Sequence, residues 1–213
     1  PLDLIDVFHQ KKVPIRQGYG LTEAGPNLTS LHQNDAFRKQ GSIGKPNFYV
    51  EVRILDENGR DTEADAPGEI LIGGPMVMME YWQNEETTRQ AKMGRWLRTG
   101  DIGKFDTEGF IYILDRKKNM YISGGENVYP AEVERVLLRH KSIDEAVVIA
   151  FPDKKWGECG IAFIVANIPV TKEDLKSYCL EHLAKFKIPS QFSFVDVIPK
   201  NDTGKIDRKT IRK

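Results

Sequence analysis

The sequence lacks three features that would each point to a class of protein. It has two cysteines in 213 residues, Cys159 and Cys179, too few for a disulfide framework and outside any CxxC or Cys/His cluster that would bind zinc. Neither charge is in excess, because 31 Lys and Arg balance 31 Asp and Glu. No apolar run approaches the roughly 18 residues that span a bilayer. These absences disfavour a disulfide-stabilised secreted domain, a general nucleic-acid binder and a transmembrane protein, and we expect a reduced, cytoplasmic setting.

What is present is the composition of a globular protein. Hydrophobic residues make up 40% of the chain and charged residues 29%, a balance unlike that of disordered chains. The length suits one domain or two small ones. The chain starts without methionine in an apolar stripe at 4–8 that predicts a short amphipathic helix. We therefore expect a fragment, or a deliberately shortened version, of a longer protein.

The first half predicts short strands joined by tight turns. The expected strands are 49–55, 69–72, 102–105 and 110–114. The first runs into Asn58-Gly59, which is the strongest short hairpin signal. Asn84 is expected to cap a helix over 85–92, whose first turn is acidic.

The second half predicts the order helix–strand–strand–helix–strand, which suggests a small α+β domain. Pro130 is expected to begin the first helix. Thr171 and Asp174 form a capping box for the second helix, which Pro189 is expected to end. The expected strands are 146–150, 161–165 and 191–198. We place the domain boundary between residues 114 and 119.

Residues 17–23 carry groups that suit a magnesium nucleotide. Gly18 and Gly20 allow backbone to approach a ligand closely. Tyr19 offers a ring face to a base, Thr22 a hydroxyl to phosphate, and Glu23 a carboxylate to Mg²⁺. A tight turn beside a buried tyrosine is the alternative interpretation.

Two further stretches place single charges on glycine turns. Asp101 follows Arg-Thr-Gly, where a carboxylate can accept two ribose hydroxyls, although an Asx-type turn explains it as well. Lys205 lies in a Thr-Gly-Lys turn within 199–213, where six basic residues face two acidic ones. The functional interpretation is an ammonium group presented to an anionic centre. The alternatives are a solubilising tail or a weak nucleic-acid contact, and the neutral chain disfavours the latter.

The stretch 114–127 ends an expected strand in a dense charge cluster and continues into Ser123-Gly124-Gly125. A solvated linker would explain the charges. It explains the glycine pair less well, because flexible backbone at that point invites close approach of a ligand.

Together these motifs resemble the adenylate-forming superfamily, and within it the acyl-CoA synthetases, the fatty-acid and aryl-acid CoA ligases. The motifs are Tyr-Gly-Leu-Thr-Glu (19–23), Arg-Thr-Gly-Asp (98–101), Asp-Arg (115–116) with Ser-Gly-Gly-Glu-Asn-Val-Tyr-Pro-Ala-Glu-Val-Glu (123–134), and Thr-Gly-Lys-Ile-Asp-Arg (203–208). The resemblance covers essentially the whole chain. It implies an α+β fold, in which 1–116 are the strand-rich, distorted β-barrel-like end of a large AMP-binding domain and 117–213 are a small lid domain.

The resemblance also implies ATP and AMP contacts for particular residues. These are Gly18, Tyr19, Gly20, Thr22, Asp101, Arg116 and Lys205. Tyr19 would stack on adenine, Asp101 would bind the ribose hydroxyls and Arg116 would support the ribose. Lys205, Thr22 and Glu23 would be the catalytic group, with Glu23 helping to hold Mg²⁺.

For the lid, the resemblance implies a hinge at Lys118 and coenzyme A contacts at the glycine loop and two aromatic residues. The coenzyme A set is Ser123, Gly124, Gly125, Trp156 and Phe186. Two core aromatics are the alternative for Trp156 and Phe186. The residue two positions after Phe186, often basic in such ligases, is Ile188 here.

The implied activity converts a carboxylic acid, ATP and coenzyme A into a thioester and AMP by way of an acyl-adenylate. The family's Ser/Thr/Gly-rich phosphate loop has no match in 1–34, so we expect the isolated chain to be inactive. The rival interpretations are an adenylation domain of a peptide synthetase, a luciferase-like oxygenase, and a non-enzymatic nucleotide- or coenzyme-A-binding module. The Ser-Gly-Gly-Glu-Asn-Val-Tyr-Pro stretch favours the acyl-CoA ligases. A role in fatty-acid metabolism and a homodimer are further expectations, and the acid itself is not specified by the sequence.

Overall fold

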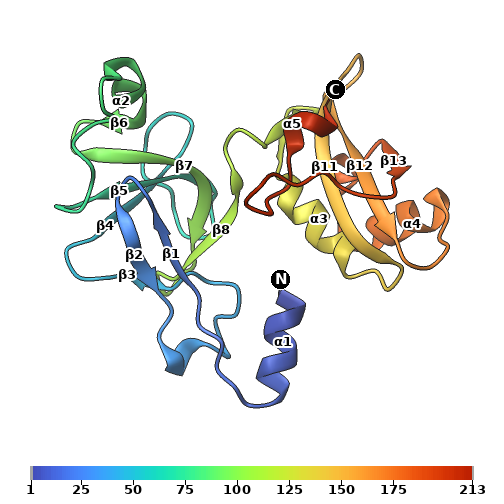
Figure 1. Cartoon of the computed structure of the whole chain (residues 1–213), viewed down its shortest axis with the longest axis horizontal. Coiled ribbons are helices and arrows are strands. Elements are labelled where there is room, and N and C mark those ends of the chain that lie inside the picture. Colours follow the sequence, from blue (N-terminus) through green and yellow to red (C-terminus); the bar gives the residue numbers. More distant parts are fainter. Residues whose placement is uncertain (1, 213) are drawn as a thin grey trace. The chain divides into compact units, whose positions relative to one another are not determined.

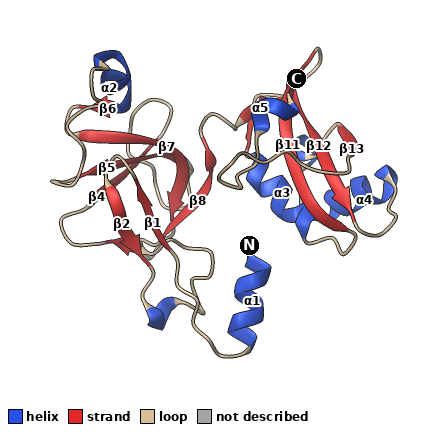
Figure 2. Cartoon of the chain, in the orientation of Figure 1, coloured by secondary structure: helices blue, strands red, loops and turns tan. Residues whose placement is uncertain are grey.

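The computed structural model describes residues 2–212, and the chain divides into two compact units between Lys117 and Lys118 (Figure 1). The division falls within the 114–119 segment, one residue beyond the expected 116/117 boundary. Strands dominate the first unit, whereas the second combines one sheet with helices (Figure 2). The predicted α+β class is confirmed. Among the described residues, no helix is long and apolar enough to cross a bilayer.

The first unit contains two antiparallel sheets. The three-stranded sheet has the order β1-β2-β3, and the five-stranded sheet has the order β4-β5-β7-β6 with β8 beside β7. The strands are β1 (Gly18–Leu21), β2 (Gly25–Ser30), β3 (Lys45–Pro46), β4 (Glu51–Leu55), β5 (Gly68–Gly73), β6 (Lys92–Met93), β7 (Trp96–Phe105) and β8 (Ile111–Arg116). The helices are α1 (Leu2–Gln10), η1 (Gln33–Asp35) and α2 (Glu85–Ala91). Strand β5 is buried along its length: it pairs on both edges, with β4 and β7, and Ile70 and Ile72 pack in the hydrophobic core of the unit.

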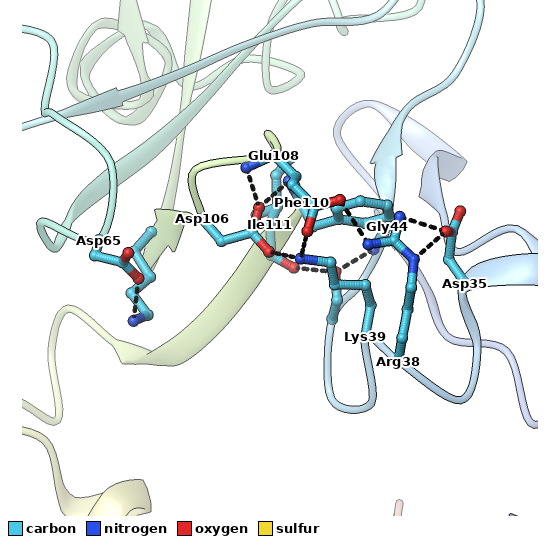
Figure 3. A network of polar contacts seen from close by, with 11 residues as sticks. Asp35, Arg38, Lys39, Gly44, Asp65, Asp106, Glu108, Phe110 and Ile111 are labelled. Carbon is cyan, nitrogen blue, oxygen red and sulfur yellow. Dashed lines mark hydrogen bonds and ion pairs between the residues drawn. The ribbon is translucent and has the colours of Figure 1, made fainter.

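A network of charges fixes the turn between β7 and β8 (Figure 3). Lys39 pairs with Asp106 at 2.7 Å and with Glu108 at 2.5 Å, and Arg38 pairs with Glu108 at 2.5 Å. Both cations also lie over the buried ring of Phe110, 4.9 and 5.1 Å from its centroid. The network ties the β7–β8 hairpin to the loop after η1. It therefore stabilises the two strands that carry Asp101 and Arg116.

The second unit is a five-stranded sheet with two helices against one face. Its strand order is β10-β9-β12-β11, with β13 parallel to β12. The strands are β9 (Tyr121–Ser123), β10 (Glu126–Val128), β11 (Ile143–Asp153), β12 (Gly157–Ala166) and β13 (Gln191–Phe194). The helices are α3 (Pro130–Leu138), α4 (Lys172–His182), η2 (Lys185–Lys187) and α5 (Arg208–Ile211). Val148 on β11 packs with α3 and α4, whereas Val147 and Ile149 face the other way, toward Ile206.

Local signals predicted the caps of two helices, and three expectations are corrected. Asn84 caps α2, and the capping box of α4 is present. The Asn58-Gly59 turn forms, but the main partner of β4 is β5, and a single bridge joins Leu55 to Asp61 after the turn. Helix α4 ends at His182, not at Pro189, because Leu183 is extended and buries its side chain. Strand β13 stops at Phe194, where its pairing with β12 ends.

Candidate functional site

Asp101 is the centre of the candidate site in the first unit. Its residue surface is only 4% exposed. One carboxylate oxygen accepts a hydrogen bond from the Tyr19 hydroxyl at 2.5 Å. The other pairs with Nε of Arg116 at 2.9 Å, and Arg116 also donates to the carbonyl oxygen of Thr99 at 3.2 Å. The structure thus brings together the tyrosine, the acid and the arginine that the sequence analysis singled out in three separate motifs.

Burial sets the protonation of this cluster. It raises the pKa of Asp101 above the usual range of an aspartic acid, although the Tyr19 hydroxyl and the Arg116 charge act in the opposite direction. Burial also raises the pKa of the Tyr19 phenol, and the hydrogen bond to Asp101 adds to the rise. Tyr19 therefore keeps its proton and stays a donor at neutral pH. Each carboxylate oxygen of Asp101 has a second lone pair, so a diol can still be accepted.

The glycines of the 17–23 stretch serve the β1–β2 hairpin. A Cβ added to Gly20 would lie 2.3 Å from the carbonyl oxygen of Pro26, and one on Gly18 would lie 3.0 Å from that of Thr29. At these two positions the glycines therefore allow the backbones of β1 and β2 to approach each other closely. Its effect on the site is to hold Tyr19, the residue between the two glycines, in a fixed register opposite Thr29.

Glu23 lies in the turn after β1 with both ends held. Its Oε1 accepts a hydrogen bond from the Tyr81 hydroxyl at 2.8 Å, and its carbonyl oxygen accepts one from the backbone N–H of Met78 at 2.8 Å. Burial, followed by the hydrogen bond to Glu23, raises the pKa of Tyr81, so this hydroxyl is also a donor at neutral pH. Thr22, one residue earlier, is exposed at the same turn.

The chemistry of Glu23 fits a magnesium ion that is bound mainly by its nucleotide. Among the described residues there is no group of three or more His, Cys, Asp or Glu side chains arranged to hold a metal. Mg²⁺ in nucleotide enzymes is commonly held by one or two carboxylates together with phosphate oxygens and water. A half-buried carboxylate with one oxygen fixed by Tyr81 suits that kind of site.

The end of β8 is fastened to the first unit as far as Lys117. The Lys117 backbone N–H donates to the carbonyl oxygen of Gly100 at 2.8 Å. Its ammonium group lies 2.9 Å from Oε2 of Glu69, which also pairs with Arg98 at 2.9 Å. Glu69 is 8% exposed. Lys118, the expected hinge, is exposed and is the first residue of the second unit.

The Ser123-Gly124-Gly125 segment forms the tight turn between β9 and β10. Both glycines have positive φ, at 62° and 89°. Gly124 donates its backbone N–H to the carbonyl oxygen of Trp156 at 2.9 Å, and a Cβ at Gly124 would lie 2.9 Å from the Trp156 ring. Trp156 is 48% exposed. The structure therefore joins the glycine turn and the tryptophan into one partly exposed surface.

Phe186 has a different environment from Trp156. It lies in η2, is partly buried and packs against the hydrophobic core of the second unit. The neighbouring Lys187 pairs with Glu132 at 2.7 Å, and its ammonium group lies 5.7 Å from the centroid of the Phe186 ring. The alternative of a core aromatic thus describes Phe186 better than it describes Trp156.

Lys205 is exposed at the end of a tight turn near the C-terminus. A single bridge between Lys200 and Ile206 closes the turn. Oδ1 of Asn201 accepts hydrogen bonds from the backbone N–H of Thr203 at 3.1 Å and of Lys205 at 2.9 Å. The side chain of Asn201 thus organises the turn from within.

Four residues that hold the candidate site in place had no role assigned from the sequence, although Glu134 and Arg208 lie within the quoted motifs. They are Glu69, Tyr81, Glu134 and Arg208. A buried-strand pattern that contains an acid was the available signal for Glu69, since an isolated charge on such a strand needs a partner. Tyr81 had no local signal, because its partner lies 58 positions away in sequence.

Comparison with known families identifies the chain. Residues 1–82 match the family model described as "AMP-binding enzyme", and residues 132–205 match the model described as "AMP-binding enzyme C-terminal domain". The chain belongs to the adenylate-forming superfamily of AMP-binding enzymes.

Several individual relatives within this superfamily are CoA ligases. A 2-succinylbenzoate–CoA ligase of Bacillus licheniformis is 43% identical over 98% of this chain and 43% of its own length. An o-succinylbenzoate CoA synthetase of Bacillus subtilis, solved with its acyl-adenylate intermediate, is 42% identical with a TM-score of 0.94 over 100% of this chain and 44% of its own. The same synthetase solved with ATP and magnesium is 41% identical with a TM-score of 0.92, again over 100% of this chain and 44% of its own. The chain spans less than half the length of these relatives, and their names refer to an aryl acid, so fatty-acid metabolism is not supported.

Proposed function

We propose that this chain is the nucleotide-contacting end and the lid of an ATP-dependent CoA ligase that activates an aryl carboxylic acid. The observation that carries the proposal is the buried Asp101 carboxylate, which holds Tyr19 and Arg116 from two other family motifs. The names of the relatives make 2-succinylbenzoate the first acid to test. The cosubstrates are ATP and coenzyme A, and Mg²⁺ is the metal.

The proposed reaction has two steps. In the first, a carboxylate oxygen of the acid bonds to the α-phosphorus of ATP, the bond to the β-phosphate oxygen breaks, and pyrophosphate leaves with the electron pair. In the second, the sulfur of coenzyme A attacks the acyl carbon, the thiol proton is lost, and AMP leaves. The acid and the triphosphate repel each other, so cations are needed in the first step. Magnesium, when bound, neutralises phosphate charge.

The residues of the first unit bind and orient the nucleotide. Asp101 accepts the ribose hydroxyls, and Arg116 supports the ribose while it holds the acid. Tyr19 presents a ring face to adenine, because its hydroxyl is fixed by Asp101. Thr22 contacts the α-phosphate, and Glu23 holds Mg²⁺ with an oxygen that Tyr81 orients.

The second unit supplies one surface for each step. Lys205 brings its ammonium group to the carboxylate and α-phosphate for adenylation. The Ser123–Gly125 turn and Trp156 guide coenzyme A for thioester formation, with Phe186 as a lesser contact from the core side. Lys118 is the hinge, because the fastened end of the first unit stops at Lys117.

A hybrid ligase tests the two-step chemistry of the proposal, while its upstream part supplies most of the acid pocket. In it, this chain follows the upstream part of the Bacillus subtilis relative and replaces the matched segment. With 2-succinylbenzoate, ATP, Mg²⁺ and coenzyme A, we expect the thioester, AMP and pyrophosphate in equal amounts. Aliphatic fatty acids and amine acceptors are the comparison substrates. Nucleotide binding without any adenylate would instead identify a binding module and overturn the enzymatic proposal.

Lys205→Ala in the hybrid ligase separates the two steps. Loss of the ammonium group is expected to lower acid-dependent pyrophosphate exchange by about 10²–10³, as for removal of other preorganised charges. Thioester formation from supplied acyl-adenylate is expected to stay near the unsubstituted rate. Exchange at the unsubstituted rate would contradict the role given to Lys205.

A cytoplasmic location and a homodimer stay predictions.

A further inference from the structure

The Lys205 turn has little internal structure to fix its position. One bridge, the hydrogen bonds to Asn201 and the bond from the Asp207 N–H to the carbonyl oxygen of Pro199 define its shape, but they do not attach it to the rest of the unit. Ile206, Arg208 and Lys200 attach the turn to the sheet, and Lys200 does so through an exposed ion pair with Glu145 on β11. Ile206 packs with Val147 and Ile149 on one face of the sheet. Arg208 makes the more buried of the two polar attachments.

Arg208 binds two elements at once. Its Nη1 donates to the carbonyl oxygen of Val148 on β11 at 2.7 Å. Its Nη2 lies 2.7 and 3.0 Å from the two carboxylate oxygens of Glu134 on α3. The side chains of Arg208 and Glu134 are 24% and 12% exposed, so water screens the pair only in part.

The receiving site is built around the edge of the sheet. Strand β11 is the last in its sheet, which leaves alternate backbone groups without a partner strand. Glu134 accepts a hydrogen bond from the backbone N–H of Val148 at 2.7 Å, and Arg208 donates one to the carbonyl oxygen of the same residue. Glu134 therefore satisfies a backbone donor at the edge of the sheet and also presents a negative charge to Arg208.

We infer that Glu134 and Arg208 are positioning residues that hold the Lys205 turn against β11 and so set where the lysine can reach during adenylation. The inference rests on the proposed function for Lys205 and adds the pair that acts through it. Misplacing a catalytic group by about 1 Å can cost about 10²-fold in rate. The alternative role, a staple that only stabilises the unit, predicts equal loss of both half-reactions.

Hydrogen exchange in the 213-residue chain tests the attachment without relying on any activity. Arg208→Gln and Glu134→Gln are each expected to speed exchange of the Thr203–Lys205 backbone amides by about tenfold relative to the amides of β12. The matched control is Glu145→Gln, which breaks the more exposed ion pair between Lys200 and Glu145 at the base of the same turn. It is expected to change exchange by less than about twofold. Unchanged exchange in Arg208→Gln overturns the inference, as does an equal effect of Glu145→Gln.

Half-reactions of the hybrid ligase test the positioning role. Arg208→Gln is expected to lower pyrophosphate exchange by about 10- to 100-fold and to leave thioester formation from supplied acyl-adenylate within about threefold. Arg208→Lys keeps the charge without the forked geometry and should recover part of the loss. An equal fall in both half-reactions, or no fall in adenylation, overturns the role. If the unsubstituted hybrid forms no adenylate, the proposed function fails, while the exchange experiment still decides whether the pair holds the turn.

Discussion

Glu69→Gln tests whether the ion pairs around Glu69 fix the end of the first unit at Lys117. Glu69 lies on the buried strand β5, and its Oε2 pairs with both Arg98 and Lys117 at 2.9 Å. Glutamine keeps the shape but removes the charge. Its amide oxygen can take the place of Oε2 and accept both hydrogen bonds, so the substitution tests the contribution of the negative charge.

The expected cost follows from exposure. Hydrogen bonds to charged groups contribute about 1.5–3 kcal/mol when both partners are buried. The Arg98 and Lys117 side chains are 39% and 53% exposed, and water screens each of them. Discounting for that screening leaves about 0.5–1 kcal/mol for each pair. We therefore expect the first unit to lose about 1–2 kcal/mol of stability, with local loosening at Lys117.

Hydrogen exchange measures both effects in one experiment. The slowest amides of β5 give the stability of the first unit, and the Lys117 amide, bonded to Gly100, gives the local opening. Exchange of the Lys117 amide should rise by at least about fivefold, a factor that corresponds to about 1 kcal/mol. Glu51→Gln, which breaks the exposed pair with Arg95, is the control and should change little. An unaltered Lys117 amide in Glu69→Gln would refute the reasoning.

Three further substitutions test the site in the hybrid ligase. Tyr81→Phe removes the hydrogen-bond donor that orients the Glu23 carboxylate. The Mg²⁺ concentration needed for nucleotide binding, measured by calorimetry, should therefore rise about tenfold. An unchanged Mg²⁺ requirement would show that Tyr81 has no role in metal binding. Gly124→Ala and Gly125→Ala both place a side chain at positive φ, at a cost of about 1–2 kcal/mol, but only Gly124 meets the Trp156 ring. KM for coenzyme A should therefore rise more in Gly124→Ala, and equal values would argue against a shared surface.

Local sequence signals predicted the elements whose stabilising contacts are also local. Asn84 and the Thr171–Asp174 pair lie within a few residues of the backbone groups that they cap, so the sequence alone reveals them. The end of α4 was not predictable in this way. Leu183 continues the helical spacing, but an extended backbone buries its side chain in the core, and tertiary packing overrides the periodicity.

In the candidate site, too, local signals were predictable from the sequence and long-range contacts were not. Motifs revealed Tyr19, Asp101 and Arg116 as separate residues, but the hydrogen bond that joins the first two spans 82 positions and appears only in the fold. From the sequence alone, Gly20 suggests room for a ligand, whereas in the structure the nearest neighbour of a Cβ added there is the backbone of Pro26. A glycine reports close approach without identifying what approaches, so this distinction needs coordinates.

Under the proposed function, one sheet of the second unit holds the two loops that serve the two half-reactions. The Ser123–Gly125 turn is attached through β9 to β12, and the Lys205 turn is attached through Arg208 to Glu134 and β11. Because β11 and β12 are paired along most of their length, the two turns are attached to neighbouring strands of one sheet. Under the proposed function, a rotation at Lys118 displaces both turns together. One hinge therefore suffices to exchange the adenylation surface for the thioester surface, and a substitution that frees either turn from the sheet should uncouple that exchange.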